Sequence, residues 1–330
     1  MDITTEFESL MNDIISKPMP PLSGGCKLEA EIANKFIERV NKDKSLLGTK
    51  LNVIKRMLWN ISLFRIYYSH RYARAQITTL KINENIIQQQ KNLVEDIKEN
   101  MDKYKESFLL LDDESKQTYI DLIRMKYTGD FSYGLKHYHS DFQYFDKAIK
   151  LANTFNIVDC GGYIGDTMLN YLKHSIIPNK YYVYELEDEN FKKLKKNARI
   201  MEIKGTKVIA KKKGVWSESR MLYFKADRDS SRIVNYETSD YIQVVSLDDD
   251  IDERVDVIKM DIEGSEVEAL NGAKRLITNY RPILEICIYH KTDDFWRIPL
   301  LIKDICPYYQ KWIIRHYSDN YNETVLYAFC

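Results

Sequence analysis

The chain has no excess charge of either sign and no long uninterrupted apolar run. Its 330 residues contain 49 Lys+Arg and 49 Asp+Glu, so the formal net charge at pH 7 is zero. Such a balance argues against a broad binding surface for nucleic acid, although a local basic patch stays compatible with it. In the most apolar long stretch, residues 51–68, the charges of Lys55, Arg56 and Arg65 exclude a membrane-spanning helix. We therefore expect neither a nucleic-acid partner nor a transmembrane segment.

Cysteine is also scarce, and its spacing is uninformative for metal or disulfide chemistry. The five cysteines form no C-x-x-C pair and are odd in number. This pattern favours reduced thiols over a disulfide framework or a zinc site. The first residues, MDITTEFESL, are acidic and lack a positively charged segment followed by an apolar one, so we expect no secretory signal. Both features predict a cytoplasmic protein.

The pattern of apolar residues changes near residue 150. Residues 1–150 show helical spacing and few strand-like runs, which predicts a helical N-terminal region with a loop at residues 17–25, KPMPPLSGG. Residues 151–330 alternate β-branched runs with helical segments. We expect the second part to form a separate domain with the principal binding site.

A seven-residue repeat predicts a long helix with a packing seam in the N-terminal region. Apolar side chains recur at Leu80, Ile87, Val94, Met101 and Phe108. A second column holds Ile97 and Tyr104 but is interrupted by Asn83 and Gln90. The interruption favours an intramolecular helical hairpin over a coiled-coil dimer, and the oligomeric state stays open. The basic and aromatic residues 56–74 fit an amphipathic helix that covers the core, with a membrane-surface helix as the alternative.

The second part predicts a doubly wound α/β fold. Short apolar strands are expected in FNIVDC, KYYVYEL, KVIAKK, VDVIKMD and PILEICIYH, with helices near 166–174, 188–200 and 264–278 between them. Continuous apolar strands separated by helices indicate a mostly parallel, Rossmann-like sheet with both faces covered. YQKWIIRHY and ETVLYAFC, joined by SDNYN, predict an antiparallel C-terminal hairpin.

A glycine cluster follows the first strand of this sheet, in NIVDCGGYIGDT. Gly161, Gly162 and Gly165 allow a tight turn and a close approach of ligand to backbone, and Asp166 suits the start of the next helix. In doubly wound sheets the ligand lies beyond the carboxyl ends of the strands. The spacing G-G-x-x-G is one residue shorter than the dinucleotide fingerprint G-x-G-x-x-G. The cluster therefore predicts a cofactor site but disfavours a nicotinamide dinucleotide.

Two carboxylates further limit which cofactor the site is expected to bind. Asp159, just before the glycines, would repel a pyrophosphate but accept hydrogen bonds from an ammonium group. Glu185, at the end of the second strand, is placed to accept two hydrogen bonds from a ribose diol. A ligand with an ammonium group, a ribose and no phosphate is S-adenosylmethionine.

These segments, together with SLDDDI, VIKMDIEGSEVEALNGAKRLI and EICIYHKTDDFWRIPLLI, resemble the FkbM family of S-adenosylmethionine-dependent methyltransferases. The resemblance covers roughly residues 105–330, and the combination of KMDIEG with EALNGA is more specific than the glycine turn. It implies a class I methyltransferase sheet and O-methylation, often of a sugar or secondary-metabolite hydroxyl. The family's second strand commonly ends in a Phe-Glu-Pro-like run, whereas here it reads YELE. The acid is present and the proline is not.

Three side chains at the carboxyl ends of later strands are candidates for catalysis. Asp261 and Glu263 follow the fourth strand, and His290 follows the fifth. We expect His290 to act as base or to orient the acceptor, since imidazole suits a base near neutral pH, with the two carboxylates positioning cofactor and substrate. Each has a structural alternative, as a helix cap, a first-turn acid or a structural histidine. No metal is predicted, because HYHSD offers His137, His139 and Asp141 without a further ligand placed by the sequence.

The leading hypothesis is an O-methyltransferase that acts on a carbohydrate or natural-product acceptor. The alternatives are a catalytically silent protein that binds the cofactor and, less favoured by the glycine spacing, a nicotinamide-dependent oxidoreductase. The sequence does not specify the acceptor.

Overall fold

The computed structural model describes residues 2–20, 86–139, 143–225, 232–233 and 240–330. The aromatic stretch 56–74, most of the predicted loop at 17–25, and Leu80, Asn83 and Asp141 lie outside these ranges. Within them, no helix combines the length and apolarity needed to cross a bilayer.

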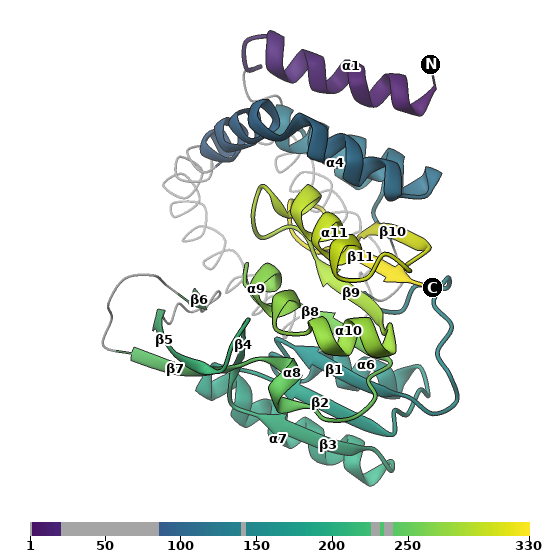
Figure 1. Cartoon of the computed structure of the whole chain (residues 1–330), viewed down its shortest axis with the longest axis vertical. Coiled ribbons are helices and arrows are strands. Elements are labelled where there is room, and N and C mark those ends of the chain that lie inside the picture. Colours follow the sequence, from purple (N-terminus) through teal and green to yellow (C-terminus); the bar gives the residue numbers. More distant parts are fainter. Residues whose placement is uncertain (1, 21–85, 140–142, 226–231, 234–239) are drawn as a thin grey trace, which may run out of the picture.

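A seven-stranded sheet forms the centre of the fold (Figure 1), and it confirms the predicted doubly wound, mostly parallel class. Its order is β10-β11-β9-β8-β1-β2-β3. The strands are β1 (Asn156–Cys160), β2 (Lys180–Tyr184), β3 (Lys207–Lys211), β8 (Val257–Met260), β9 (Ile283–Cys287), β10 (Lys311–His316) and β11 (Thr324–Phe329). Only β11 runs against its neighbours β9 and β10, as the predicted C-terminal hairpin requires. Central strands such as β8 are buried along their whole length, which explains their continuous apolar sequences.

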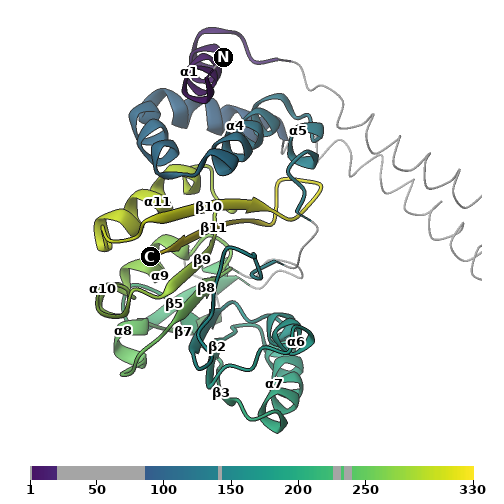
Figure 2. The ribbon, with the colours of Figure 1, turned by 90° about the vertical axis from the view of Figure 1, so that its right-hand side faces the viewer.

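Helices cover both faces of the sheet (Figure 2). On one side lie α6 (Asp166–Lys173) and α7 (Asp188–Ile203), and on the other lie α8 (Leu247–Asp250), α9 (Glu266–Asn271), α10 (Lys274–Tyr280) and α11 (Asp294–Ile305). The single helix predicted at 264–278 is thus two short helices. Gly272 and Ala273 lie between them, and glycine is required at 272 because a Cβ atom there would lie 2.0 Å from the carbonyl oxygen of Trp216.

A second, four-stranded sheet was not predicted. It contains β4 (Gly214–Val215), β5 (Arg220–Lys225), β6 (Arg232–Ile233) and β7 (Asp240–Val245), in the order β4-β7-β5-β6. It lies in the chain between β3 and β8, where the sequence shows no clear alternation with helices. Its first strand brings Gly214 and Val215 to the edge of the main cavity.

The N-terminal helices share one apolar core with the sheet. They are α1 (Ile3–Ser16), a helix over residues 86–110, α4 (Asp113–Thr128) and the short α5 (Ser132–Leu135). The Phe7 and Phe108 rings stack with centroids 4.2 Å apart, and Tyr119 of α4 meets Phe295 of α11 edge-on at 5.4 Å. The boundary predicted at residue 150 therefore separates segments that are buried in the same cluster.

The helix over residues 86–110 packs through the interrupted column and through Phe108 of the first column. Ile97 and Tyr104 are fully buried, whereas Ile87 of the first column is 37% exposed. Gln90 is buried as well, because its side-chain amide donates to the carbonyl oxygen of Tyr127 at 2.7 Å. A polar residue in the seam is tolerated when its hydrogen bond is made.

The same helical region closes the β10 edge of the sheet. The Ile314 amide donates to Ser115 Oγ at 2.8 Å, and the carbonyl oxygen of Trp312 accepts from the Asp112 amide at 3.2 Å. Farther along, the His316 carbonyl accepts from the His139 amide at 2.8 Å. These contacts occupy backbone groups that an open edge strand would offer to another chain.

The shared core predicts one cooperative unfolding transition in urea. Phe108→Ala should lower the free energy of unfolding by about 3–5 kcal/mol, because it removes a fully buried ring between α1 and α4. The neighbouring Leu109→Ala is the matched control, since Leu109 is 54% exposed and its loss should change stability by no more than ~0.5 kcal/mol. Separate transitions for helices and sheet, or equal effects of the two variants, would contradict a common core.

Candidate active site

Lys259 connects the carboxyl ends of β1 and β8. Its side chain is 3% exposed, with Nζ 2.9 Å from Asp159 Oδ1, and it donates to the Gly161 carbonyl oxygen at 2.7 Å. Tyr181 donates to the other oxygen of Asp159 at 2.7 Å. Burial alone would lower the pKa of Lys259, but Asp159 and Asp261 raise it well above its ordinary value, so the ammonium stays charged.

This contact gives Asp159 a partner within the protein. The sequence predicted that Asp159 would accept hydrogen bonds from the ammonium group of a ligand. In the structure an ammonium does lie against Asp159, but it belongs to Lys259. Asp159 is fully buried and does not line the cavity described below.

The glycine turn is required mainly by packing between loops. Gly161 has φ +81°, and a Cβ atom there would lie 1.8 Å from the Asp261 carbonyl oxygen. A Cβ atom at Gly162 would lie 2.2 Å from Val183 Cγ2. The amides of both glycines donate to the carbonyl oxygen of Tyr184, at 3.0 and 2.9 Å. Their N–H groups are thus already engaged, and a ligand would meet the surface of the turn instead.

Gly165 ends the turn and starts α6. It has φ +83° as the residue before the helix, and its amide donates to the Gly162 carbonyl at 2.7 Å. Asp166 is the first residue of α6, where a carboxylate is favoured by the helix dipole. Its side chain borders the cavity.

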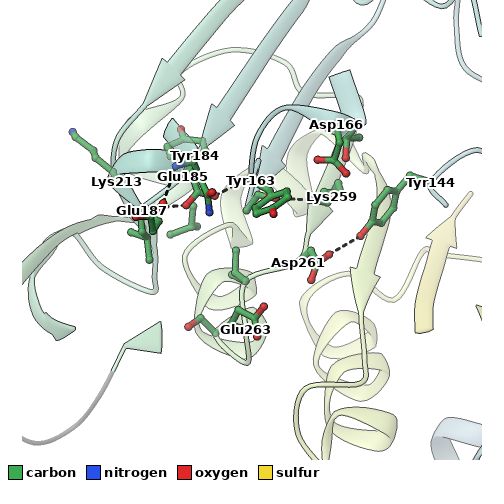
Figure 3. Close-up of a pocket in the computed structure, with 18 of the residues that line it drawn as sticks. Tyr144, Tyr163, Asp166, Tyr184, Glu185, Glu187, Lys213, Lys259, Asp261 and Glu263 are labelled. Carbon is green, nitrogen blue, oxygen red and sulfur yellow. Dashed lines mark hydrogen bonds between the residues drawn. The ribbon is translucent and has the colours of Figure 1, made fainter. Parts of the chain in front are cut away.

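A cavity of about 480 Å³ lies over this turn, at the carboxyl ends of β1, β2 and β8 (Figure 3). Its wall is rich in acids and tyrosines. The carboxylates are Asp166, Glu185, Glu187, Asp261, Glu263 and Glu323, the tyrosines are Tyr144, Tyr163, Tyr184 and Tyr289, and the lysines are Lys213 and Lys259. Figure 3 shows the side chains of Glu185 and Glu187 on one side of Tyr163, and those of Asp261 and Tyr144 on the other.

The cavity brings together five of the nine residues predicted for the site. Those that line it are Gly161, Asp166, Glu185, Asp261 and Glu263. Asp159, Gly162 and Gly165 lie behind its wall and shape it. His290 borders a neighbouring cavity, which also touches Glu263.

Glu185 is held by two backbone amides at the end of β2. Its Oε2 accepts from the Tyr163 amide and its Oε1 from the Glu187 amide, both at 2.8 Å. Burial raises the pKa of Glu185, and these two hydrogen bonds oppose the shift. The carboxylate is thereby fixed in orientation, and each oxygen keeps a lone pair for a further donor.

Asp261 is a carboxylate held by two tyrosines. Tyr144 donates to its Oδ2 and Tyr289 to its Oδ1, both at 3.1 Å. Burial disfavours the charge, but Lys259, His290 and the two hydroxyls outweigh it and lower the pKa of Asp261. It is therefore ionised at neutral pH.

His290 lies among carboxylates and carries a proton at neutral pH. Its side chain is 7% exposed, with Nδ1 2.9 Å from Glu266 Oε1 and Nε2 3.4 Å from Asp261 Oδ1. Burial would lower the pKa of His290, but Glu266, Asp261 and Glu263 raise it to about 9. An imidazolium has no free lone pair, so this environment favours a charge partner over a base.

The pKa of Glu263 shifts in the opposite direction to that of Asp261, although only one residue separates them. Burial raises the pKa of Glu263, and Asp261 raises it further, whereas His290 lowers it. Its backbone has φ +55°, and Tyr144 and Tyr163 of the cavity also have positive φ, at +69° and +46°. Such strain in non-glycine residues is concentrated at functional sites.

The histidines of HYHSD lie elsewhere. His137 Nε2 is 2.8 Å from Asp121 Oδ2 on α4, and its Nδ1 lies 3.2 Å from Thr118 Oγ1. His137 therefore joins α4 to the segment that follows α5. Across the described part of the chain, no group of three or more His, Cys, Asp or Glu side chains is arranged to hold a metal ion.

Several polar residues of the site were not predicted from the sequence, among them Tyr144, Tyr289, Lys259 and Glu323. These four come from different segments, and only Tyr289 and Lys259 lie within two positions of a residue that had been singled out. A lysine inside the otherwise apolar strand VDVIKMD was the available signal, because a buried charge needs a partner. Tyr144 precedes β1, so only the tertiary fold brings it to Asp261.

The buried pair of Lys259 and Asp159 predicts a strongly coupled effect on stability. Lys259→Met and Asp159→Asn should each lower the free energy of unfolding by about 3–5 kcal/mol, since each leaves the other group without its partner. The double variant should lose much less than the sum of the two. Urea unfolding of the four proteins measures this coupling, and additive losses would show that the pair is not an energetic unit.

Comparison with known proteins finds similarity to methyltransferases. Residues 159–315 match the methyltransferase FkbM domain. The crystal structure of methyltransferase FkbM from Methylobacillus flagellatus KT is similar, with a TM-score of 0.63 and 25% sequence identity, over 72% of this chain and 62% of that one. The chain thus spans less than two thirds of that relative's length.

An rRNA methylase from Streptococcus thermophilus aligns with 13% identity and a TM-score of 0.35, over 54% of this chain and 87% of its own. No curated protein matches significantly. The resemblance found in the sequence is confirmed for residues 159–315, which match the methyltransferase FkbM domain.

Proposed function

We propose that this protein is an S-adenosylmethionine-dependent methyltransferase that methylates a hydroxyl group of a carbohydrate or natural-product acceptor. The observation that carries the cofactor assignment is the charge of the cavity. Six carboxylates and two lysines line it, and one of the lysines, Lys259, is already paired with Asp159. Such a wall attracts a cation and repels the pyrophosphate of a nicotinamide dinucleotide.

The fixed groups of the cavity fit the parts of this cofactor. Glu185 presents both carboxylate oxygens and would hold the ribose hydroxyls. Asp261 and Asp166 would face the positively charged methionine end, since both border the cavity. When bound, S-adenosylmethionine supplies an electrophilic methyl group on a sulfonium centre.

Asp261 and Glu263 would have different roles in the reaction. Asp261, with its lowered pKa, stays ionised and stabilises positive charge in the cavity. Glu263, with its raised pKa, is the better proton acceptor and would take the proton of the acceptor hydroxyl. We assign His290 to positioning, since its imidazolium balances Glu266, Asp261 and Glu263. This assignment moves the base from His290, which the sequence favoured, to Glu263.

Isothermal calorimetry tests the cofactor. S-adenosylmethionine and S-adenosylhomocysteine should bind, and NAD and NADP should give no heat. Glu185→Ala should weaken binding by about 1.5–3 kcal/mol, because it removes a charged acceptor from the ribose hydroxyls. Glu189→Ala is the control, since Glu189 is 67% exposed on α7 and does not line the cavity. Tight NAD binding would overturn the proposal, and S-adenosylhomocysteine formation with hydroxylated acceptors would separate an enzyme from a silent binding protein.

Steady-state kinetics test the base. Glu263→Gln should lower kcat by about 10²–10⁴-fold while the affinity for S-adenosylmethionine stays nearly constant. In the unaltered protein, kcat/KM should fall as pH drops through the pKa of Glu263, which lies above the ordinary 4.5, because the protonated acid cannot accept the proton. Glu263→Gln should lose this acidic limb. If His290→Gln removes a pH limb and Glu263→Gln does not, the histidine is the base.

A further inference from the structure

A second cavity adjoins the first at Glu263. It has a volume of about 450 Å³, and Glu263, Tyr289 and Glu323 belong to the walls of both cavities. Its other walls come from the helix over residues 86–110, from α4, from the segment after β9 and from the loop between β10 and β11. The N-terminal helices and the methyltransferase domain thus build it together.

Two further lysines bring positive charge to the second cavity. Lys126 and Lys291 line the second cavity but not the first. Among the described residues, no carboxylate lies within ion-pair distance of either ammonium group. Lys126 lies over the Phe295 ring at 4.9 Å, and burial lowers its pKa to about 8 despite the nearby Asp294. A half-buried ammonium without a carboxylate partner is a favourable position for an anion to bind.

The remaining side chains of the cavity suit hydroxyl groups. Gln89 and Asn322 carry amides, Thr292 carries a hydroxyl, and Tyr321 adds an aromatic ring. Amides and hydroxyls both donate and accept, as a polyhydroxylated ligand requires. Apart from Leu93 and the aromatic rings, the cavity is therefore lined by polar groups, with the two lysines as cations and Glu263 and Glu323 as carboxylates at the shared wall.

We propose that the second cavity is the acceptor site and that the acceptor is a polyhydroxylated molecule bearing an anionic group, a phosphate or a carboxylate, which Lys126 and Lys291 bind. The hydroxyl to be methylated then lies at the shared wall beside Glu263. This deepens the proposed function and rests on it for the role of acceptor. The anion binding itself requires no cofactor.

Calorimetry of the full chain without cofactor tests the site with three probes. Glucose 6-phosphate and glucuronate carry a phosphate and a carboxylate on similar sugars, and glucose carries neither. At least one of the two anionic sugars should bind about tenfold or more tightly than glucose. The stronger of them identifies which anion the lysines prefer.

Variants then locate the binding. Lys126→Met keeps the aliphatic packing on Phe295 and should weaken binding of the anionic sugar about tenfold or more, and Lys291→Gln, at an exposed position, should weaken it in the same direction. Lys116→Gln is the matched control, because Lys116 also lies on α4 over an aromatic ring, that of Phe108, yet lines neither cavity. Circular dichroism confirms that each variant is folded.

The outcomes separate this proposal from that of the cofactor. Equal affinity for glucose and both anions, no binding of either anion, or an equal loss in Lys116→Gln would each overturn the anionic acceptor. S-adenosylmethionine binding is measured separately, so a protein that binds this cofactor but no anionic sugar refutes only the acceptor class. A protein that binds the anionic sugar through the two lysines but not the cofactor refutes only the cofactor.

Discussion

The buried ammonium of Lys259 is the contact on which the site depends. It stands in register between Asp159 on β1 and Glu285 on β9, and it also reaches the Gly161 carbonyl oxygen. One charge thereby fixes the glycine turn to the sheet and neutralises an acid that would otherwise be buried alone. Removing a charge of this kind leaves its partner uncompensated, so the geometry of the turn and the stability of the sheet are linked.

The carboxylates that line the cavity differ in the direction of their pKa shifts. Lys259, His290 and two tyrosine hydroxyls keep Asp261 ionised, whereas Glu263 receives less compensation for its burial. Burial also raises the pKa of Glu185, although two amides fix its position. Adjacent carboxylates with opposite pKa shifts are a means by which one site provides both a permanent charge and a proton acceptor.

The N-terminal helices have two physical roles in the described structure. They cover the β10 edge and extend the core through Phe108 and Tyr119, and they supply Gln89, Leu93 and Lys126 to the second cavity. Figure 1 shows α4 beside α11 and β10, at the end of the molecule away from α7. A helix that both stabilises the sheet and lines a cavity couples folding to the shape of that cavity.

The sequence by itself determined the parallel strands, the glycine turn and the carboxylates at strand ends, because these depend on local periodicity and on the fixed polarity of a doubly wound sheet. It missed the small sheet of β4 to β7 and predicted one helix at 264–278, where the structure has two helices on either side of Gly272 and Ala273. Tertiary structure alone decided which partner each charge meets. Lys259 forms an ion pair with Asp159, and His290 forms one with Glu266. Tyr144 donates a hydrogen bond to Asp261, which lies 117 positions away in the chain. Protonation follows from such distant neighbours through burial and Coulomb energy, and no local pattern encodes them.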